Sequence, residues 1–236
     1  MTKHGKKYRQ AFAKIEADKL YEPRQALELV RETSYTSFDG TVEVHIRLGV
    51  DPKQAEQQVR DTVMLPHGTG KTVRVLVFAE GDGARAAEVA GADIVGSDDV
   101  IQRVKDGWLE FDATVATPDM MGKIGKSGLG RILGTRGLMP NPKAGTVVAA
   151  ADLGRMVQEL KAGRVEFRQD KTGNLHVPIG KASFAADKLY DNMATLMESV
   201  KKSRPPSAKG SYVRKVTVTS TMGPGIRVDP NAALAM

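Results

Sequence analysis

The sequence predicts an α/β protein of two domains, in which a parallel α/β domain is inserted into a discontinuous α+β domain. The length of 236 residues exceeds the roughly 100–200 residues of one typical domain. The apolar pattern also changes twice, because strands with one apolar face precede and follow a middle part that opens with a wholly apolar strand. We therefore expect residues 1–69 and 160–236 to form one domain and residues 70–159 to form the other.

The first outer segment carries both helical and strand patterns. Tyr8, Ala11, Phe12 and Ile15 recur at helical spacing, and Pro23 suits the first position of a second helix. Alternating apolar and polar residues follow, as is typical of a half-buried strand. The expected elements are a helix over residues 4–17, a helix from Pro23, and strands over residues 41–48 and 59–65.

In the middle part, short strands alternate with helices. Its first strand is almost continuously apolar, as expected of a parallel strand that is covered on both faces. The alternation implies right-handed crossovers and a small doubly wound sheet. The expected elements are strands over residues 73–79, 94–95 and 113–116, helices over residues 84–90, 98–106 and 152–162, and a basic, glycine-rich stretch over residues 122–145.

The last segment returns to one-sided strands. Asp170–Asn174 contains the turn residues that indicate a hairpin between the two strands around it. Together, the two outer segments supply a single antiparallel sheet with helices on one face. The expected elements are strands over residues 164–168, 175–179 and 212–220 and a helix over residues 187–202, whereas residues 231–236 carry no motif.

The positive charge is unevenly distributed. The formal net charge of +7 is made up of +1 in residues 1–69, −1 in residues 70–159 and +7 in residues 160–236. Residues 120–151 hold five basic and no acidic side chains. Because clustered lysine and arginine release counterions from phosphates, this asymmetry indicates a polyanionic partner such as a nucleic acid. A solvated basic face is the alternative interpretation.

Composition excludes several kinds of site. No run of about 18 apolar residues occurs, and no apolar stretch follows the basic N-terminus, so we expect neither a membrane span nor a secretory signal. The absence of cysteine excludes disulfides, thiolate metal sites and a cysteine nucleophile. The four histidines are scattered without ligand spacing, so no metal site is expected. These features predict a soluble, cytoplasmic protein.

One turn supports an enzymatic alternative. Gly81–Ala86 follows the apolar strand and opens a helix, which matches the dinucleotide-binding fingerprint in its Gly/Ala form. Asp98 and Asp99 lie close to the distance of roughly 20 residues at which a carboxylate binds the ribose. The alternative is therefore a dinucleotide-binding oxidoreductase, although small residues are also ordinary in tight strand-to-helix turns and no hydride-transfer partner is evident.

The glycine-rich basic stretch is the most distinctive part of the chain. Its glycines allow close backbone approach and its basic side chains can bind phosphates, whereas a charged surface loop would have the same composition. The residues Gly130–Lys143 strongly resemble the signature of the bacterial ribosomal protein L-one family, the stalk proteins beside the tRNA exit site. Further matches cover nearly the whole chain and include Lys3–Lys6, Val42–Val44, Leu65–Gly68, Asp170–Gly173 and Thr221–Pro224.

This resemblance implies a fold and a function. The family has a first domain built from both chain ends, with a split β-α-β type antiparallel sheet, and an inserted Rossmann-like three-layer α/β domain. The first domain binds the rRNA stalk of the large ribosomal subunit, which moves as tRNA leaves the exit site. Many members also repress their own messenger RNA through a leader that mimics the rRNA site. The resemblance therefore implies a ribosome-associated, non-enzymatic protein that needs no cofactor and is a monomer when free.

The same resemblance implies an RNA-binding site. Hydroxyl groups can bind a ribose 2′-OH, phenylalanine and methionine can pack on a sugar or base, and basic side chains can bind phosphates. A carboxylate repels phosphate, so Glu43 is expected to accept from a 2′-OH or a base amine, and Gly223 is expected to let RNA approach the backbone. The expected rRNA-binding residues are Phe38, Thr41, Glu43, Arg168, Lys171, Thr172, Gly173, His176, Thr221, Met222 and Gly223, with Lys123, Lys126, Arg131 and Arg136 as a secondary RNA contact.

Overall fold

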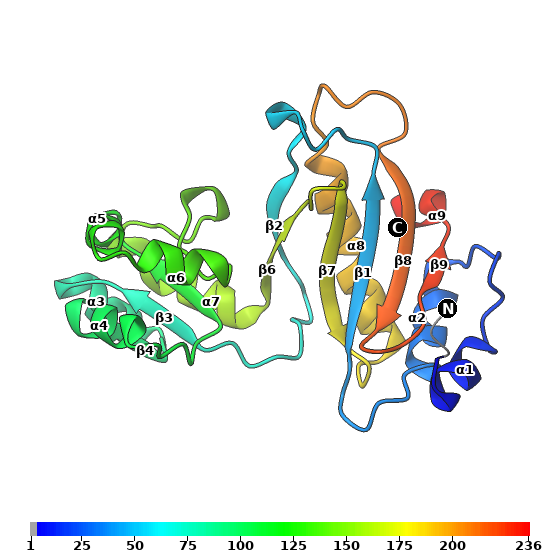
Figure 1. The fold of residues 1–236 in the computed structure, drawn as a ribbon, viewed down its shortest axis with the longest axis horizontal. Coiled ribbons are helices and arrows are strands. Elements are labelled where there is room, and N and C mark those ends of the chain that lie inside the picture. The colour runs from blue at the N-terminus through cyan, green and yellow to red at the C-terminus, as the bar shows by residue number, and fades with distance from the viewer. Residues whose placement is uncertain (1–3) are drawn as a thin grey trace. The chain divides into compact units, whose positions relative to one another are not determined.

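The computed structural model describes residues 4–236, and the chain divides into two compact units. One unit contains the described residues up to Gly70 together with Val165–Met236, and the other contains Lys71–Arg164 (Figure 1). Each unit has its own sheets and its own apolar core. Among residues 4–236, no helix is both long and apolar enough to cross a membrane.

The first unit is built on a four-stranded antiparallel sheet with the strand order β7-β1-β8-β9. The central strand is β1 (Thr41–Leu48), which lies between β7 (Asn174–Lys181) and β8 (Val213–Ser220), and β9 (Ile226–Val228) forms the far edge. Along β1, buried residues alternate with half-buried or exposed ones, which confirms the predicted one-sided strand.

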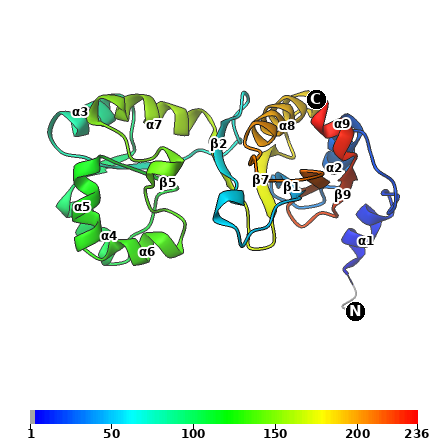
Figure 2. The same cartoon turned by 90° about the horizontal axis from the view of Figure 1, so that it is seen from above.

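Helices cover one face of this sheet. α2 (Pro23–Glu32) and α8 (Ala186–Lys202) pack on each other and on the strands, and α9 (Pro230–Leu234) packs beside them (Figure 2). α2 begins at Pro23, as predicted from the suitability of proline for the first helical position. The polar residues of β1 therefore lie on the opposite face of the sheet.

The predicted pairing of the two strands around Asp170–Asn174 is wrong. The chain does reverse at Asp170–Asn174, where the Asp170 N–H donates to Asn174 O over 2.8 Å. However, β6 (Arg164–Arg168) pairs with β2 (Arg60–Met64) in a separate two-stranded sheet, whereas β7 pairs with β1. The turn residues fix where the chain reverses but not which strands pair, because β1, β2, β6 and β7 all bury side chains in one apolar core.

The second unit is a three-layer α/β structure with a parallel sheet of order β4-β3-β5, which confirms the predicted fold class. All four residues of β3 are buried, as predicted for a strand covered on both faces. Two helices lie on one side of the sheet and three on the other (Figure 2). The elements are β3 (Val75–Phe78), α3 (Gly81–Val89), β4 (Ile94–Gly96), α4 (Asp98–Lys105), β5 (Ala113–Ala116), α5 (Pro118–Lys126), α6 (Leu129–Thr135) and α7 (Leu153–Ala162).

Much of the glycine-rich basic stretch is helical, which corrects the alternative of a surface loop. Helices α5 and α6 run through it, and their residues Ile124, Leu129 and Leu133 are fully buried. A Cβ added at Gly122 or Gly125 would meet no atom within 4 Å, so these glycines occupy open helix positions. Glycine there costs about 1 kcal/mol relative to alanine, and packing of the apolar side chains offsets this cost.

The remaining elements include some that the sequence pattern did not reveal. α1 (Lys6–Phe12) is shorter than the predicted helix over residues 4–17. β9 and α9 were not predicted, although Asp229 caps α9 by accepting from the Asn231 N–H over 2.9 Å. Three short 3-10 helices complete the described residues: η1 (Ala55–Gln57), η2 (Pro142–Ala144) and η3 (Ala150–Asp152).

Candidate nucleic-acid interface

The turn between β8 and β9 contains Met222, the only non-glycine residue with a positive φ within residues 4–236. Its φ of 63° lies in the left-handed region, which costs about 1–2 kcal/mol for a residue with a side chain. The side chain is 68% exposed, so burial of apolar surface does not offset this cost. Backbone strain at an exposed apolar residue is typical of a binding site.

Hydrogen bonds to distant segments hold this turn. The Thr221 N–H donates to Thr41 O, and the Thr41 N–H donates to Thr221 Oγ1, both over 2.9 Å. The hydroxyl of Tyr35 donates to Met222 O over 2.6 Å. Lys181 Nζ lies 3.0 Å from Thr41 Oγ1 and donates to it. The strained backbone is therefore fixed by hydrogen bonds from Thr41 and Tyr35, while the Met222 side chain remains exposed.

Gly223 has a steric role inside this turn. Its N–H donates to Ser220 O over 2.7 Å, and its carbonyl oxygen accepts from Thr219 Oγ1 over 3.1 Å. A Cβ on Gly223 would lie 2.3 Å from Ser220 Oγ and 3.1 Å from Ser220 O. Any side chain at this position would therefore displace the buried Ser220, so the turn itself requires glycine.

Phe38 lies in the loop that leads into β1. Asp39 fixes the loop backbone by accepting from the Ser183 N–H over 3.0 Å and from its hydroxyl over 2.7 Å. The Phe38 ring is nevertheless 59% exposed. A Cβ on Gly40 would lie 3.5 Å from Thr221 Cβ, so this loop and the strained turn lie side by side. Two exposed apolar side chains thus project from rigid backbone at one end of the sheet.

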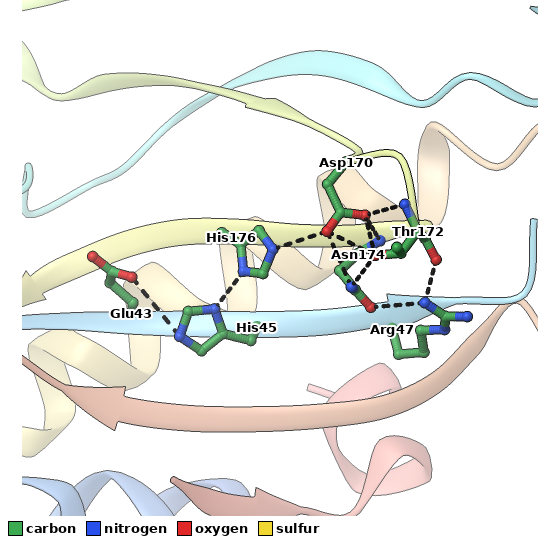
Figure 3. A network of polar contacts seen from close by, with 7 residues as sticks. All are labelled: Glu43, His45, Arg47, Asp170, Thr172, Asn174 and His176. Carbon is green, nitrogen blue, oxygen red and sulfur yellow. Dashed lines mark hydrogen bonds and ion pairs between the residues drawn. The ribbon is translucent and has the colours of Figure 1, made fainter. Parts of the chain in front are cut away.

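A row of polar side chains runs along β1 and β7 (Figure 3). Glu43 lies 3.8 Å from His45 Nε2, and the Nδ1 atoms of His45 and His176 are 2.7 Å apart. His176 Nε2 in turn lies 3.4 Å from the carboxylate of Asp170. Because His45 and His176 are opposite each other in the strand register, the antiparallel pairing itself brings the two imidazoles together.

The contact between the imidazoles needs one unprotonated nitrogen. One Nδ1 must donate and the other must accept, so the hydrogen bond persists with at most one extra proton on the pair. Burial lowers the pKa of His45, and the nearby His176 lowers it further, whereas Glu43 raises it. The protonation of His45 is therefore disfavoured by its burial and by the imidazole opposite it.

Asp170 organises the turn that carries the expected phosphate ligands. Its Oδ1 accepts from the backbone N–H groups of Thr172 and Asn174 and from the Thr172 hydroxyl, each over 2.8 Å. Although burial raises it, these hydrogen bonds hold the pKa of Asp170 well below its usual range. Gly173 has a φ of 78°, which favours glycine, and the exposed Lys171 projects from the same turn.

The expected site residues form two groups at opposite ends of β1. Thr41 contacts the strained turn, whereas Arg47 lies opposite Asn174 and donates to the carbonyl oxygen of Thr172. Six residue steps along a strand correspond to about 20 Å, so the Asp170 turn and the strained turn are separated by roughly the length of β1. We call the surface between and including these ends the polar strip; it comprises Phe38, Thr41, Glu43, His45, Arg47, Lys171, Thr172, Gly173, His176, Thr221, Met222 and Gly223. The exposed Arg168 lies at the end of β6, two residues before Asp170.

Sequence reasoning missed several residues of this surface. His45 and Arg47 share the polar face of β1 with Glu43, so the alternation of the strand was a usable signal. Tyr35 gave no such signal, because its contact with Met222 joins residues that are 187 positions apart.

The expected secondary RNA contact lies in the second unit. Lys123, Lys126, Arg131 and Arg136 are all exposed on or directly after α5 and α6. Lys123 forms ion pairs with Glu80 and, over 3.6 Å, with Asp98, and the hydrogen bond to Glu80 raises its pKa. The other three cations have no carboxylate partner within residues 4–236, so they are more available to a polyanion. Across the same residues, no cluster of three or more His, Asp or Glu side chains could hold a metal ion.

Comparison with known proteins shows which family has this arrangement. The family described as Ribosomal protein L1p/L10e matches residues 30–224, which include most of both units and the whole polar strip. The chain belongs to this family. Proteins called large ribosomal subunit protein uL1 from two strains of Chloroflexus aurantiacus are each 61% identical over 234 residues, covering 99% of this chain and 98% of theirs. The protein of that name from Chloroflexus aggregans is 60% identical over 230 residues, covering 97% and 96%.

Family membership makes the chain a ribosomal protein rather than an enzyme, which overturns the dinucleotide-binding oxidoreductase alternative. In the structure, Gly83 of the Gly81–Ala86 turn has a packing role instead. A Cβ on Gly83 would lie 3.2 Å from both Ala150 Cβ and Leu153 Cδ1. Gly83 therefore allows α3 to pack closely on η3 and the start of α7.

The histidine pair predicts a specific pH response. Because folding lowers the pKa of His45, the unfolded chain binds a proton more readily, and the free energy of unfolding should fall as the pH falls below about 6.5. Replacing His176→Gln removes a neighbouring positive charge, so the pKa of His45 should rise. NMR titration of the imidazole signals measures this shift, with the signals of the remote His4 as an internal control. An unchanged His45 titration curve would contradict the coupling.

Proposed function

We propose that the protein binds the rRNA stalk of the large ribosomal subunit through the polar strip. The observation that carries this proposal is the strained Met222, whose side chain is exposed beside the exposed Phe38 on a backbone fixed by hydrogen bonds. Such rigid, exposed apolar groups are suited to pack on sugars and bases of an irregular RNA. The relatives named large ribosomal subunit protein uL1 support the choice of this RNA.

The contacts of the strip suggest different roles for its members. The hydroxyl groups of Thr41 and Thr221 are engaged within the protein, so these residues position the turn rather than bind a ribose directly. Lys171 of the strip and Arg168, which lies outside it at the end of β6, are exposed and have no carboxylate partner within residues 4–236, which suits them to phosphates. Glu43 would accept from a ribose 2′-OH or a base amine, with the His45–His176 pair beside it as a further donor.

Charge supports the assignment of the main RNA contact to the first unit. The outer residues, 1–70 and 165–236, carry 22 basic and 16 acidic side chains, whereas residues 71–164 carry 13 and 12, so the formal net charges are +6 and +1. Because phosphate contacts supply much of the affinity for RNA, the first unit is the stronger candidate.

The proposal extends to the wider role of the protein. On the large subunit, the protein would assist the release of deacylated tRNA at the exit site, with Lys126, Arg131 and Arg136 as a secondary RNA contact. It would also repress translation of its own messenger RNA, whose leader would present the same structure as the rRNA site. It would act in the cytoplasm, on the ribosome, and would be a monomer when free.

Replacing Met222→Gly should separate stability from binding. Glycine relieves the left-handed strain, so the first unit should gain about 1 kcal/mol of stability, measured by hydrogen exchange of the β8 amides. Loss of the side chain should weaken binding to an rRNA stalk fragment by roughly 1.5–3 kcal/mol, the transfer free energy of a buried methionine. Met64→Ala is the control, since Met64 is also exposed (41%) but lies on β2. Unchanged affinity in Met222→Gly would contradict the proposed site.

The salt dependence of binding tests which cations contact the stalk. Each phosphate contact that is lost should lower the slope of log affinity against log salt by roughly 0.7–0.9. Arg168→Ala and Lys171→Ala should therefore each flatten the slope for an isolated stalk fragment. By contrast, the slope should stay nearly unchanged when the four exposed cations of the second unit are neutralised. These cations are Lys123, Lys126, Arg131 and Arg136. The reverse ranking would mean that the second unit is the primary RNA site.

A further inference from the structure

Three aromatic rings, two of them on the N-terminal helix α1 and one just before it, stack on one another. Tyr8 and Phe12 lie four residues apart on one side of α1, and His4 lies two residues before the helix. The His4 and Tyr8 rings have centroids 4.2 Å apart and planes inclined by 23°, and the Tyr8 and Phe12 rings are 6.2 Å apart and inclined by 12°. We call these three residues the aromatic ladder.

The aromatic ladder is accessible. Phe12 is 43% exposed, His4 is exposed and Tyr8 is half-buried. Ala11 is the only buried residue of α1, so the helix is anchored through a small side chain while its large apolar side chains remain outside. A groove of about 260 Å³ lies along the ladder and is lined by His4, Tyr8, Arg9, Phe12 and Ala13. Neither the fold nor the polar strip uses this surface.

The charge around the ladder has one sign. Residues 4–15 include Lys6, Lys7, Arg9 and Lys14 and no acidic residue. None of these four cations has a carboxylate partner within residues 4–236, although Lys14 Nζ donates to the carbonyl oxygen of Glu32 over 3.5 Å. Their positive charge is therefore not neutralised by the protein and is available to an anionic partner.

Flat apolar rings among unpaired cations match one kind of partner best. Single-stranded nucleic acids present bases that stack on aromatic side chains and phosphates that bind lysine and arginine. A purely apolar protein segment would use the rings but leave the cations without partners. A duplex would use the cations but not the rings, because its bases are already stacked.

We propose that α1 is a second RNA contact, which binds an unpaired nucleotide by stacking its base on the aromatic ladder. The base adds to the ladder at the exposed Phe12 ring, and Arg9, which lines the groove, binds a neighbouring phosphate. This site deepens the proposed RNA-binding function and rests on it. It differs from the polar strip in the partner it selects, because it requires a base that is free of pairing.

The test uses the full-length protein and two probes: an oligoadenylate of eight nucleotides and an abasic oligomer of the same length. Phe12→Leu keeps an apolar side chain but removes the ring, and it should weaken oligoadenylate binding roughly 5- to 150-fold, the range for one stacked base. Phe12→Tyr should retain the affinity. Leu20→Ala is the matched control, since Leu20 is 55% exposed and lies outside the ladder. The abasic oligomer should bind weakly to all variants and respond little to Phe12→Leu.

Two results would overturn the inference. One is equal affinity of the native protein for the oligoadenylate and the abasic oligomer. This result would mean that α1 binds phosphates through its cations and does not stack on a base. The other is unchanged oligoadenylate affinity in Phe12→Leu, particularly if that variant loses binding to anionic vesicles, which would assign the ladder to a membrane surface. Binding to an rRNA stalk fragment is measured in parallel, because its absence in the native protein would reject the proposed function itself. NMR signals of the Tyr8 and Phe12 rings, shifted by the oligoadenylate, report the stacking directly.

Discussion

The candidate site depends on the position of β1 between two strands that are far away in the sequence. Thr41 exchanges hydrogen bonds with Thr221, 180 residues later, and His45 meets His176, 131 residues later. The pairing of β1 with β8 brings the strained turn to the start of β1, and the pairing of β1 with β7 brings the Asp170 turn to the end of β1. The apolar face of the same strand lies in the core against α2 and α8. One strand thus links the stability of the first unit to the geometry of its polar surface.

In this site, the backbone and the side chains have different roles. Hydrogen bonds fix the backbone at Met222, Asp39 and Asp170, whereas the exposed side chains near them have few partners within the protein. A rigid backbone reduces the entropy that is lost when RNA binds, and the exposed side chains retain their contacts for the RNA. The aromatic ladder of α1 uses a different principle, since its rings are held by stacking on each other rather than by the sheet.

The sequence predicted the elements better than their connections. Alternation in β1 and the wholly apolar β3 revealed these strands, because burial acts directly on the local pattern. The pairing of β7 with β1 could not be read from the turn at Asp170–Asn174, because a turn fixes the reversal of the chain and not the long-range partner of the strand that follows it. Glycines masked the helical spacing of the apolar residues in α5 and α6. The left-handed Met222 and its contact with Tyr35 left no local pattern, since both arise from tertiary hydrogen bonds.

Hydroxyl-radical footprinting of the full-length protein with an rRNA stalk fragment tests the central claim most directly. Met222 and Phe38 are exposed and chemically reactive, as is Met64 on β2, outside the polar strip. If the strip binds RNA, oxidation of Met222 and Phe38, measured by mass spectrometry, should fall sharply in the complex while oxidation of Met64 stays the same. Unchanged oxidation of Met222 and Phe38 in a saturated complex would contradict the account.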